Sequence, residues 1–190
     1  MPSKTELRRH YRATRRTFVA GLAKGEREAL EQALARTIMP AIAPLIAAQA
    51  LAGSYAAVGD EIDPMHVERL LGPHAFPRVR GPSLSFHLCR WDQLVPGFQD
   101  IPEPPADAPE VQPALLLVPL IAATTAGVRL GQGRGYYDRA LATLRRVRPV
   151  TAIGLAWDVQ IAPSLPAEPW DMPLDMIATP TRLVDCRKAG

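Results

Sequence analysis

The sequence predicts an α/β fold: a three-layer arrangement in which helices cover both faces of a mostly parallel, twisted sheet. Short continuous apolar runs, typical of strands buried on both faces, alternate with longer segments of helical periodicity. The length of 190 residues, with 47% hydrophobic and 22% charged residues, suits one ordinary globular domain. We therefore assign residues 1–190 to a single domain.

The first predicted element is a basic amphipathic helix. Residues 3–23 carry apolar side chains at intervals of three and four, with Ser3 as the N-cap and Glu6 as its capping-box partner. Lys4, Arg8 and Arg12 form a basic row at i, i+4 spacing on another face of this helix. Such a row can bind a polyphosphate, but most basic helix faces are only solvated, so the pattern leaves both interpretations open.

A second helical segment starts at about Glu26, and we expect Pro40 and Pro44 to kink it or to end its first part. Residues 51–58 then predict a short buried strand, and residues 65–71 predict a helix.

Acidic residues follow the predicted strand 51–58 at its carboxyl end, where open α/β sheets bind ligands. Asp63 precedes Pro64 and is explained as the cap of the next helix. Glu61 is left as the carboxylate of most functional interest.

Five further apolar segments are expected to be strands: 76–79, 83–88, 114–120, 149–157 and 174–179. The continuous apolar run of the third of these is typical of a central parallel strand. The segment from Pro96 to Pro113 contains six prolines and is expected to be an irregular loop.

Residues 127–139 concentrate four glycines, three arginines, two tyrosines and Asp138 directly before and within a predicted helix, 136–147. Glycines at alternate positions let backbone N–H groups converge on an anion, and a helix N-terminus favours negative charge. We interpret this glycine loop as a phosphate cradle; a flexible, solvated hairpin is the alternative. Neither a Walker lysine nor the acidic residue of a dinucleotide fingerprint accompanies the glycines, which argues against both of those site types.

Composition and charge argue against several other kinds of protein and site. The net charge is only +3, and the two cysteines, far apart, are expected to be free, reduced thiols without a zinc site. The chain shows neither an apolar signal region nor a membrane-spanning run, so we expect a cytoplasmic protein with no membrane partner. No histidine lies in a recognisable catalytic motif.

Residues 129–139, Arg-Leu-Gly-x-Gly-x-Gly-Tyr-Tyr-Asp-Arg, resemble the signature of the 5-formyltetrahydrofolate cyclo-ligases, also called 5,10-methenyltetrahydrofolate synthetases. Supporting matches run nearly end to end. They are Lys4-x-x-x-Arg8, Glu61-Ile62-Asp63, Pro77-Arg78-Val79, Leu84-x-Phe86, Glu103-Pro104, Gly154-Leu155-Ala156-x-Asp158-x-Gln160, and Leu165-Pro166-x-Glu168 followed by Asp171, Asp175 and Thr179.

The resemblance implies an ATP- and Mg²⁺-dependent closure of 5-formyltetrahydrofolate to 5,10-methenyltetrahydrofolate, with release of ADP and phosphate. In that reaction the formyl oxygen attacks the γ-phosphate, N10 adds to the activated carbon, and phosphate leaves. A loose phosphoryl transfer needs alignment and charge neutralisation more than a protein nucleophile, and the residue types present suit that need.

The resemblance also implies roles for individual residues. ATP would be bound by Lys4, Arg8, Arg129, Leu130, Gly131, Gln132, Gly133, Arg134, Gly135, Tyr136 and Tyr137. Catalytic roles would fall to Arg134, Tyr136 and Tyr137, although which tyrosine faces the formyl group stays open. Reduced folate would contact Glu61 and Tyr137. Asp138 and Asp171 would bind Mg²⁺, which accepts carboxylate oxygens.

Two positions depart from the family pattern: Pro64 replaces a threonine in the folate half, and Trp170 replaces a histidine beside Asp171. A divergent paralogue with another formylated or carboxylated substrate is therefore one alternative. An RNA-binding module that uses the basic first helix is another, but the chain lacks an aromatic stacking platform. We expect a monomer whose partners are reduced folate and ATP rather than nucleic acid.

Overall fold

Residues 2–188 are described by the structure, which is a computed structural model. Its α-helices are α1 (Lys4–Ala20), α2 (Glu26–Ala47), α3 (Met65–Leu71) and α4 (Tyr136–Val147). Its strands are β1 (Ala52–Gly53), β2 (His74–Arg80), β3 (Ser83–Leu88), β4 (Val95–Pro96), β5 (Pro102–Glu103), β6 (Glu110–Val111), β7 (Leu115–Pro119), β8 (Ala122–Ala123), β9 (Arg129–Leu130), β10 (Thr151–Leu155), β11 (Met176–Ala178) and β12 (Leu183–Asp185). Short 3₁₀ turns lie at Trp91–Gln93, Phe98–Asp100, Asp158–Gln160 and Cys186–Lys188.

The main sheet has eight strands in the order β12-β11-β10-β7-β1-β2-β3-β6. The five strands from β11 to β2 pair in parallel, whereas β12, β3 and β6 pair antiparallel at the two sides. The predicted mostly parallel α/β sheet is confirmed. The antiparallel flanks and the strand order go beyond what the sequence predicts.

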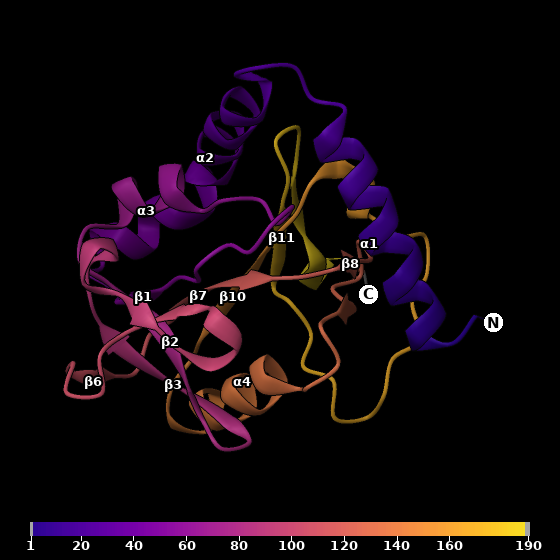
Figure 1. The fold of residues 1–190 in the computed structure, drawn as a ribbon. Coiled ribbons are helices and arrows are strands. Elements are labelled where there is room, and N and C mark those ends of the chain that lie inside the picture. Colours follow the sequence, from indigo (N-terminus) through magenta and orange to yellow (C-terminus); the bar gives the residue numbers. More distant parts are fainter. Residues whose placement is uncertain (1, 189–190) are drawn as a thin grey trace.

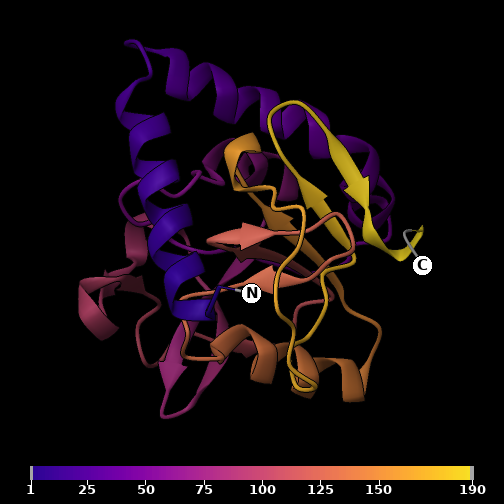
Figure 2. The ribbon, with the colours of Figure 1, turned by 90° about the vertical axis from the view of Figure 1, so that its right-hand side faces the viewer.

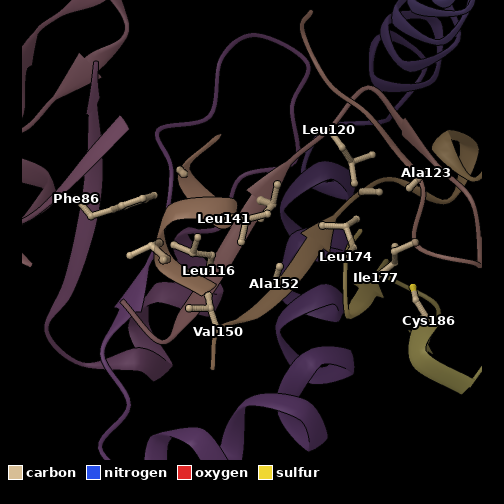
Figure 3. Packing of buried hydrophobic residues seen from close by; sticks show 14 of the residues in the cluster. Phe86, Leu116, Leu120, Ala123, Leu141, Val150, Ala152, Leu174, Ile177 and Cys186 are labelled. Carbon is tan, nitrogen blue, oxygen red and sulfur yellow. The ribbon is translucent and has the colours of Figure 1, made fainter. Parts of the chain in front are cut away.

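The sheet lies between two helical layers, with α2 and α3 over one face and α4 over the other (Figures 1 and 2). Alternate residues of β7 serve the two sides: Leu116 and Val118 join the cluster that contains Leu141 of α4, while Leu115 packs with α2. Figure 3 shows the α4 side of this packing. Because successive strand residues point to opposite faces, a continuous apolar run is what a doubly covered strand requires.

Helix α1 lies beside the carboxyl end of β7 instead of covering a sheet face. Its predicted capping box is confirmed, since Ser3 Oγ accepts from Glu6 N at 3.2 Å and Ser3 N donates to Glu6 Oε2 at 2.8 Å. Arg15, which is buried, reaches the carbonyl oxygen of Leu120 just after β7, at 3.4 Å. The basic helix is therefore placed where the parallel strands end.

Pro40 and Pro44 do not end α2, which continues to Ala47. Both prolines are exposed, while Ile38 and Ile42 of the same helix are buried against the sheet. Of the two expected outcomes, an end of the helix at the prolines was wrong, because packing of the apolar face stabilises the helix where local propensity does not. A kink at the prolines stays a prediction.

The predicted strand 51–58 is reduced to Ala52–Gly53, although residues 52–56 are all buried. The second half of the predicted strand does not pair within the sheet. It belongs to a loop in which the hydroxyl of Tyr55 donates to the carbonyl oxygen of Ile62 at 2.7 Å. The predicted cap is present, since Met65 N donates to Asp63 Oδ1 at 2.8 Å.

The proline-rich segment 96–113 is less irregular than expected, because it forms the short strands β5 and β6. Cys89 and Cys186 are free thiols, as predicted. Among residues 2–188, no helix is long and apolar enough to cross a membrane.

Candidate active site

A cleft of about 1060 Å³ opens where α1, the glycine loop, the start of α4 and the segments around residues 55–61 and 98–103 meet. Every residue that the sequence analysis assigned to ATP, folate or metal lines it: Lys4, Arg8, Glu61, Arg129, Leu130, Gly131, Gln132, Gly133, Arg134, Gly135, Tyr136, Tyr137, Asp138 and Asp171. Residues from four separate parts of the chain thus share one cavity.

The glycine loop is held against α1 by Arg8. Its Nε donates to the carbonyl oxygen of Gly131 at 2.9 Å, and a side chain at Gly133 would place a Cβ only 3.2 Å from the Arg8 guanidinium carbon. Gly133 also has φ of +99°, which side chains rarely adopt. The backbone conformation therefore favours glycine here, and a side chain at this position would crowd the Arg8 guanidinium.

The first turn of α4 faces this loop. Its N-cap, Gly135, has φ of +64° and offers no side chain to cap the helix, so the amides of the first turn receive no side-chain acceptor from that position. A helix N-terminus in this state suits an anionic group.

The two aspartates assigned to metal each form an ion pair. Asp138 Oδ1 accepts from Arg129 Nη2 at 2.7 Å and from Met172 N at 3.2 Å, and Asp171 Oδ2 accepts from Lys4 Nζ at 2.6 Å. Since Met172 is the next residue after Asp171, the backbone beside Asp171 contacts the Asp138 carboxylate. Burial alone would raise the pKa of Asp171, but the hydrogen bonds from Lys4 and from the Glu168 amide hold this pKa below its ordinary value.

Glu61 is a buried carboxylate. Its Oε2 accepts from Val58 N at 3.1 Å, its Oε1 accepts from Gln132 Nε2 at 3.2 Å, and Arg15 Nη1 lies 3.8 Å away. Burial raises the pKa of Glu61 above its ordinary value, although the hydrogen bonds and Arg15 oppose the shift.

Gln132 links the glycine loop to Glu61 and to α1. Its Nε2 donates to Glu61, and its Oε1 accepts from Arg12 Nη2. The sequence analysis placed Gln132 in the nucleotide loop and missed this link to Glu61. It placed Arg12 in the basic row of α1, at i, i+4 spacing from Arg8, but did not assign it to the ATP site.

The two adjacent tyrosines occupy different environments. The Tyr137 hydroxyl is buried with no hydrogen-bond partner among the described residues, and the Arg129 guanidinium lies 5.8 Å from the ring centroid. Burial, with a smaller contribution from Glu61, raises the Tyr137 pKa. The Tyr136 ring instead meets Phe98 edge-on at 6.3 Å and Arg139 at 5.7 Å.

Arg134 is exposed at the rim, with its guanidinium carbon 5.1 Å from the centre of the Phe98 ring. The sequence analysis did not select Phe98, the one aromatic residue within 96–113.

No histidine of the described chain lines the cleft. His87 is buried in the sheet, where it contacts Ser85 Oγ at 2.9 Å and the Ala108 carbonyl oxygen at 2.7 Å.

Curated relatives share part of this chain. The 5-formyltetrahydrofolate cyclo-ligase of Escherichia coli K12 is 33% identical over 120 residues, which are 61% of this chain and 65% of that protein. The enzyme of the same name from Mycoplasma pneumoniae is 46% identical over 61 residues, 32% of this chain and 35% of that protein. The matched region is therefore under two thirds of the length of these relatives.

Solved structures match over nearly the whole chain. The Aquifex aeolicus 5,10-methenyltetrahydrofolate synthetase has a TM-score of 0.74 and 25% identity, with 97% of this chain and 93% of that chain covered. A 5,10-methenyltetrahydrofolate synthetase from M. pneumoniae, at 22% identity and a TM-score of 0.70 over 94% of this chain and 99% of its own, supports the fold.

The model of the 5-formyltetrahydrofolate cyclo-ligase family matches residues 78–180, more than half of the chain, and this range contains the glycine loop and both aspartates. Lys4, Arg8 and Glu61 lie outside that range and are joined to it by the geometry of the cleft. The match identifies the chain as a member of the 5-formyltetrahydrofolate cyclo-ligase family.

Proposed function

We propose that this protein uses ATP and Mg²⁺ to convert 5-formyltetrahydrofolate to 5,10-methenyltetrahydrofolate. The observation that carries the proposal is the contact between Gln132 of the phosphate-cradle loop and the buried carboxylate of Glu61. This contact supports the proposal, because a reaction between a nucleotide and a reduced folate requires an anion-binding loop beside a hydrogen-bond acceptor for the folate heterocycle.

The phosphates of ATP would lie between α1 and the glycine loop. Lys4 and Arg8 supply positive charge from one side, Arg129 from the other, and the first turn of α4 points towards the same space. In a loose phosphoryl transfer such preorganised donors stabilise charge that spreads over the oxygens of the transferred group.

The carboxylates of Asp138 and Asp171 are donors of the kind that Mg²⁺ accepts. Within residues 2–188 no three His, Cys, Asp or Glu side chains gather into a metal-ligand group. Mg²⁺ is commonly held by one or two carboxylates together with substrate phosphates and water, so Asp138 and Asp171 are sufficient. The contacts described above use Oδ1 of Asp138 and Oδ2 of Asp171, which leaves the second oxygen of each for a metal. When bound, Mg²⁺ would neutralise charge on the phosphates.

The chemistry can be written with all atoms accounted for. The formyl oxygen attacks the γ-phosphorus, and the bond from that phosphorus to the β-γ bridging oxygen breaks to release ADP. N10 then adds to the formyl carbon and loses its proton, and the carbon–oxygen bond breaks to release phosphate. We propose that the Tyr137 hydroxyl donates to the formyl oxygen, because this hydroxyl is buried and has no hydrogen-bond partner among residues 2–188.

RNA binding is less well supported. Lys4, Arg8 and Arg12, which would form its basic surface, contact Asp171, Gly131 and Gln132 within the cleft. An expected monomer, a cytoplasmic location and the absence of nucleic-acid partners stay predictions.

The direct test mixes purified protein with 5-formyltetrahydrofolate, ATP and Mg²⁺ and follows the absorbance of the methenyl product. We expect product only when all components are present. Folded protein that forms no product would contradict the proposal, and product from another formylated compound alone would favour a divergent paralogue.

A further inference from the structure

The turn that carries Glu61 is held from outside the cleft by one arginine of α2. Arg27 Nη2 donates to the backbone carbonyl oxygen of Glu61 at 2.8 Å, and Arg27 Nη1 donates to that of Gly59 at 3.3 Å. A planar guanidinium can hold two carbonyl groups in a defined relation, which a lysine ammonium does not reproduce. The backbone position of Glu61 is thus tied to α2.

Glu31, one helical turn further along α2, completes this attachment. Its Oε1 accepts from Arg27 Nε at 2.9 Å and from the backbone amide of Asp63 at 3.2 Å. The Glu31 side chain is only 8% exposed, whereas that of Arg27 is 37% exposed. The buried carboxylate orients the guanidinium and also holds the far side of the turn, so backbone groups on both sides of Glu61 are fixed by one ion pair.

Arg27 and Glu31 do not line the cleft. The turn also keeps a second anchor, since Trp157 Nε1 donates to the carbonyl oxygen of Asp60 at 2.9 Å. Loss of Arg27 should therefore displace the turn without releasing it. Displacements of about 1 Å at a binding group are enough to weaken productive binding strongly.

We propose that Arg27 and Glu31 are positioning residues that set the location of the Glu61 carboxylate for the reduced folate. The inference rests on the proposed function in that Glu61 is taken as the folate-binding carboxylate. The nucleotide side of the cleft, formed by Lys4, Arg8 and the glycine loop, has no contact with this pair. The pair reaches that side only through the contact between Glu61 and Gln132, so its effect should be greater on the folate half than on the nucleotide half.

The test measures KM for both substrates in Arg27→Ala and Glu31→Ala. We expect KM for 5-formyltetrahydrofolate to rise by about tenfold, because a misplaced carboxylate loses a hydrogen-bonded contact to the folate. KM for ATP should rise much less, by about twofold at most, since a single side-chain hydrogen bond, from Gln132, links Glu61 to the nucleotide loop. Arg36→Ala, at an exposed position of the same helix, is the matched control and should leave both values unchanged.

Conservative variants separate positioning from a general loss of stability. Glu31→Gln keeps an acceptor oxygen for both Arg27 and Asp63 and should restore most of the folate affinity that Glu31→Ala loses. Arg27→Lys keeps the charge but not the fork and should stay impaired. Thermal unfolding of each variant confirms that the compared proteins are folded.

Equilibrium binding of 5-formyltetrahydrofolate without ATP, to the same variants, separates this inference from the proposed function. Normal folate affinity in Arg27→Ala and Glu31→Ala, or an equal rise in both KM values, would overturn the positioning role while leaving the activity intact. An unmodified protein that neither turns over nor binds the folate would overturn both.

Discussion

The side-chain nitrogen Nε2 of Gln132 donates to Oε1 of Glu61 at 3.2 Å, which joins the phosphate-cradle loop to the proposed folate carboxylate. Gln132 lies in the glycine loop between Gly131 and Gly133, while Glu61 lies on the turn after β1. Seventy-one positions of sequence separate them. The two halves of the proposed reaction are therefore in direct contact.

Gln132→Ala should alter the pH dependence of folate use. The hydrogen bond from Gln132 lowers the pKa of Glu61 against the opposing effect of burial, so its removal should raise that pKa further. The acidic limb of kcat/KM for the folate is then expected to shift to higher pH. Gln32→Ala, at an exposed glutamine of α2, is the control, and an unchanged profile in Gln132→Ala would argue against an ionised Glu61 in folate binding.

Glu61→Gln should lower activity, and it should also make the stability of the protein less sensitive to rising pH. Burial raises the Glu61 pKa in the folded protein, so between the ordinary value and this raised value the folded state holds more protons than the unfolded state. Stability associated with Glu61 is consequently greatest below the ordinary pKa and falls as pH rises through the raised one. In thermal unfolding between about pH 4 and about pH 8, the variant should lose less stability with rising pH than the unmodified protein; parallel curves would show that the carboxylate is not penalised by burial.

Tyr137→Phe tests the buried hydroxyl. A hydroxyl buried without a partner costs about 1 kcal/mol or more, so its removal should leave the protein at least as stable. If the hydroxyl donates to the formyl oxygen as charge develops, turnover should fall by about tenfold. Tyr136→Phe is the matched control, because the Tyr136 ring packs against Phe98 and Arg139 and keeps these contacts. A larger loss in Tyr136→Phe would reverse the assignment of the two tyrosines.

Asp138→Asn should impair Mg²⁺ use with the fold retained. The variant keeps an acceptor oxygen for Arg129, whereas Asp138→Ala would leave a buried arginine unpaired at a cost of about 3 kcal/mol. We expect Asp138→Asn to need at least about tenfold more Mg²⁺ for half-maximal turnover. Asp175→Asn is the control, since Asp175 pairs with Arg145 outside the cleft. An unaltered Mg²⁺ titration in Asp138→Asn would remove Asp138 from the metal site.

Local patterns predicted much of this fold. The apolar periodicity and capping box of α1, and the doubly buried run of β7, were sufficient because each is encoded by neighbouring residues. The strand order was not predicted, since pairing of β7 with β1 and β10 depends on contacts far apart in sequence. The helical course through Pro40 likewise depends on the sheet against which α2 packs.

The candidate site divides in the same way. Residue patterns singled out Lys4, Glu61 and the loop, the family resemblance gave them roles, and the cleft brings them together. It did not supply Phe98 or Arg27, because an aromatic residue in a proline-rich loop and an arginine on a packing helix have no distinctive local pattern. Their contacts with Arg134 and with the Glu61 backbone arise only when the chain is folded.

The most direct measurement of the central claim compares the amounts of ADP and of the methenyl product formed in one reaction. If ATP and the reduced folate react in the cleft as proposed, both products should appear together in equal amounts, and ADP release should depend on the folate. ADP released in the absence of folate at the same rate, or methenyl product formed without ATP, would contradict the account.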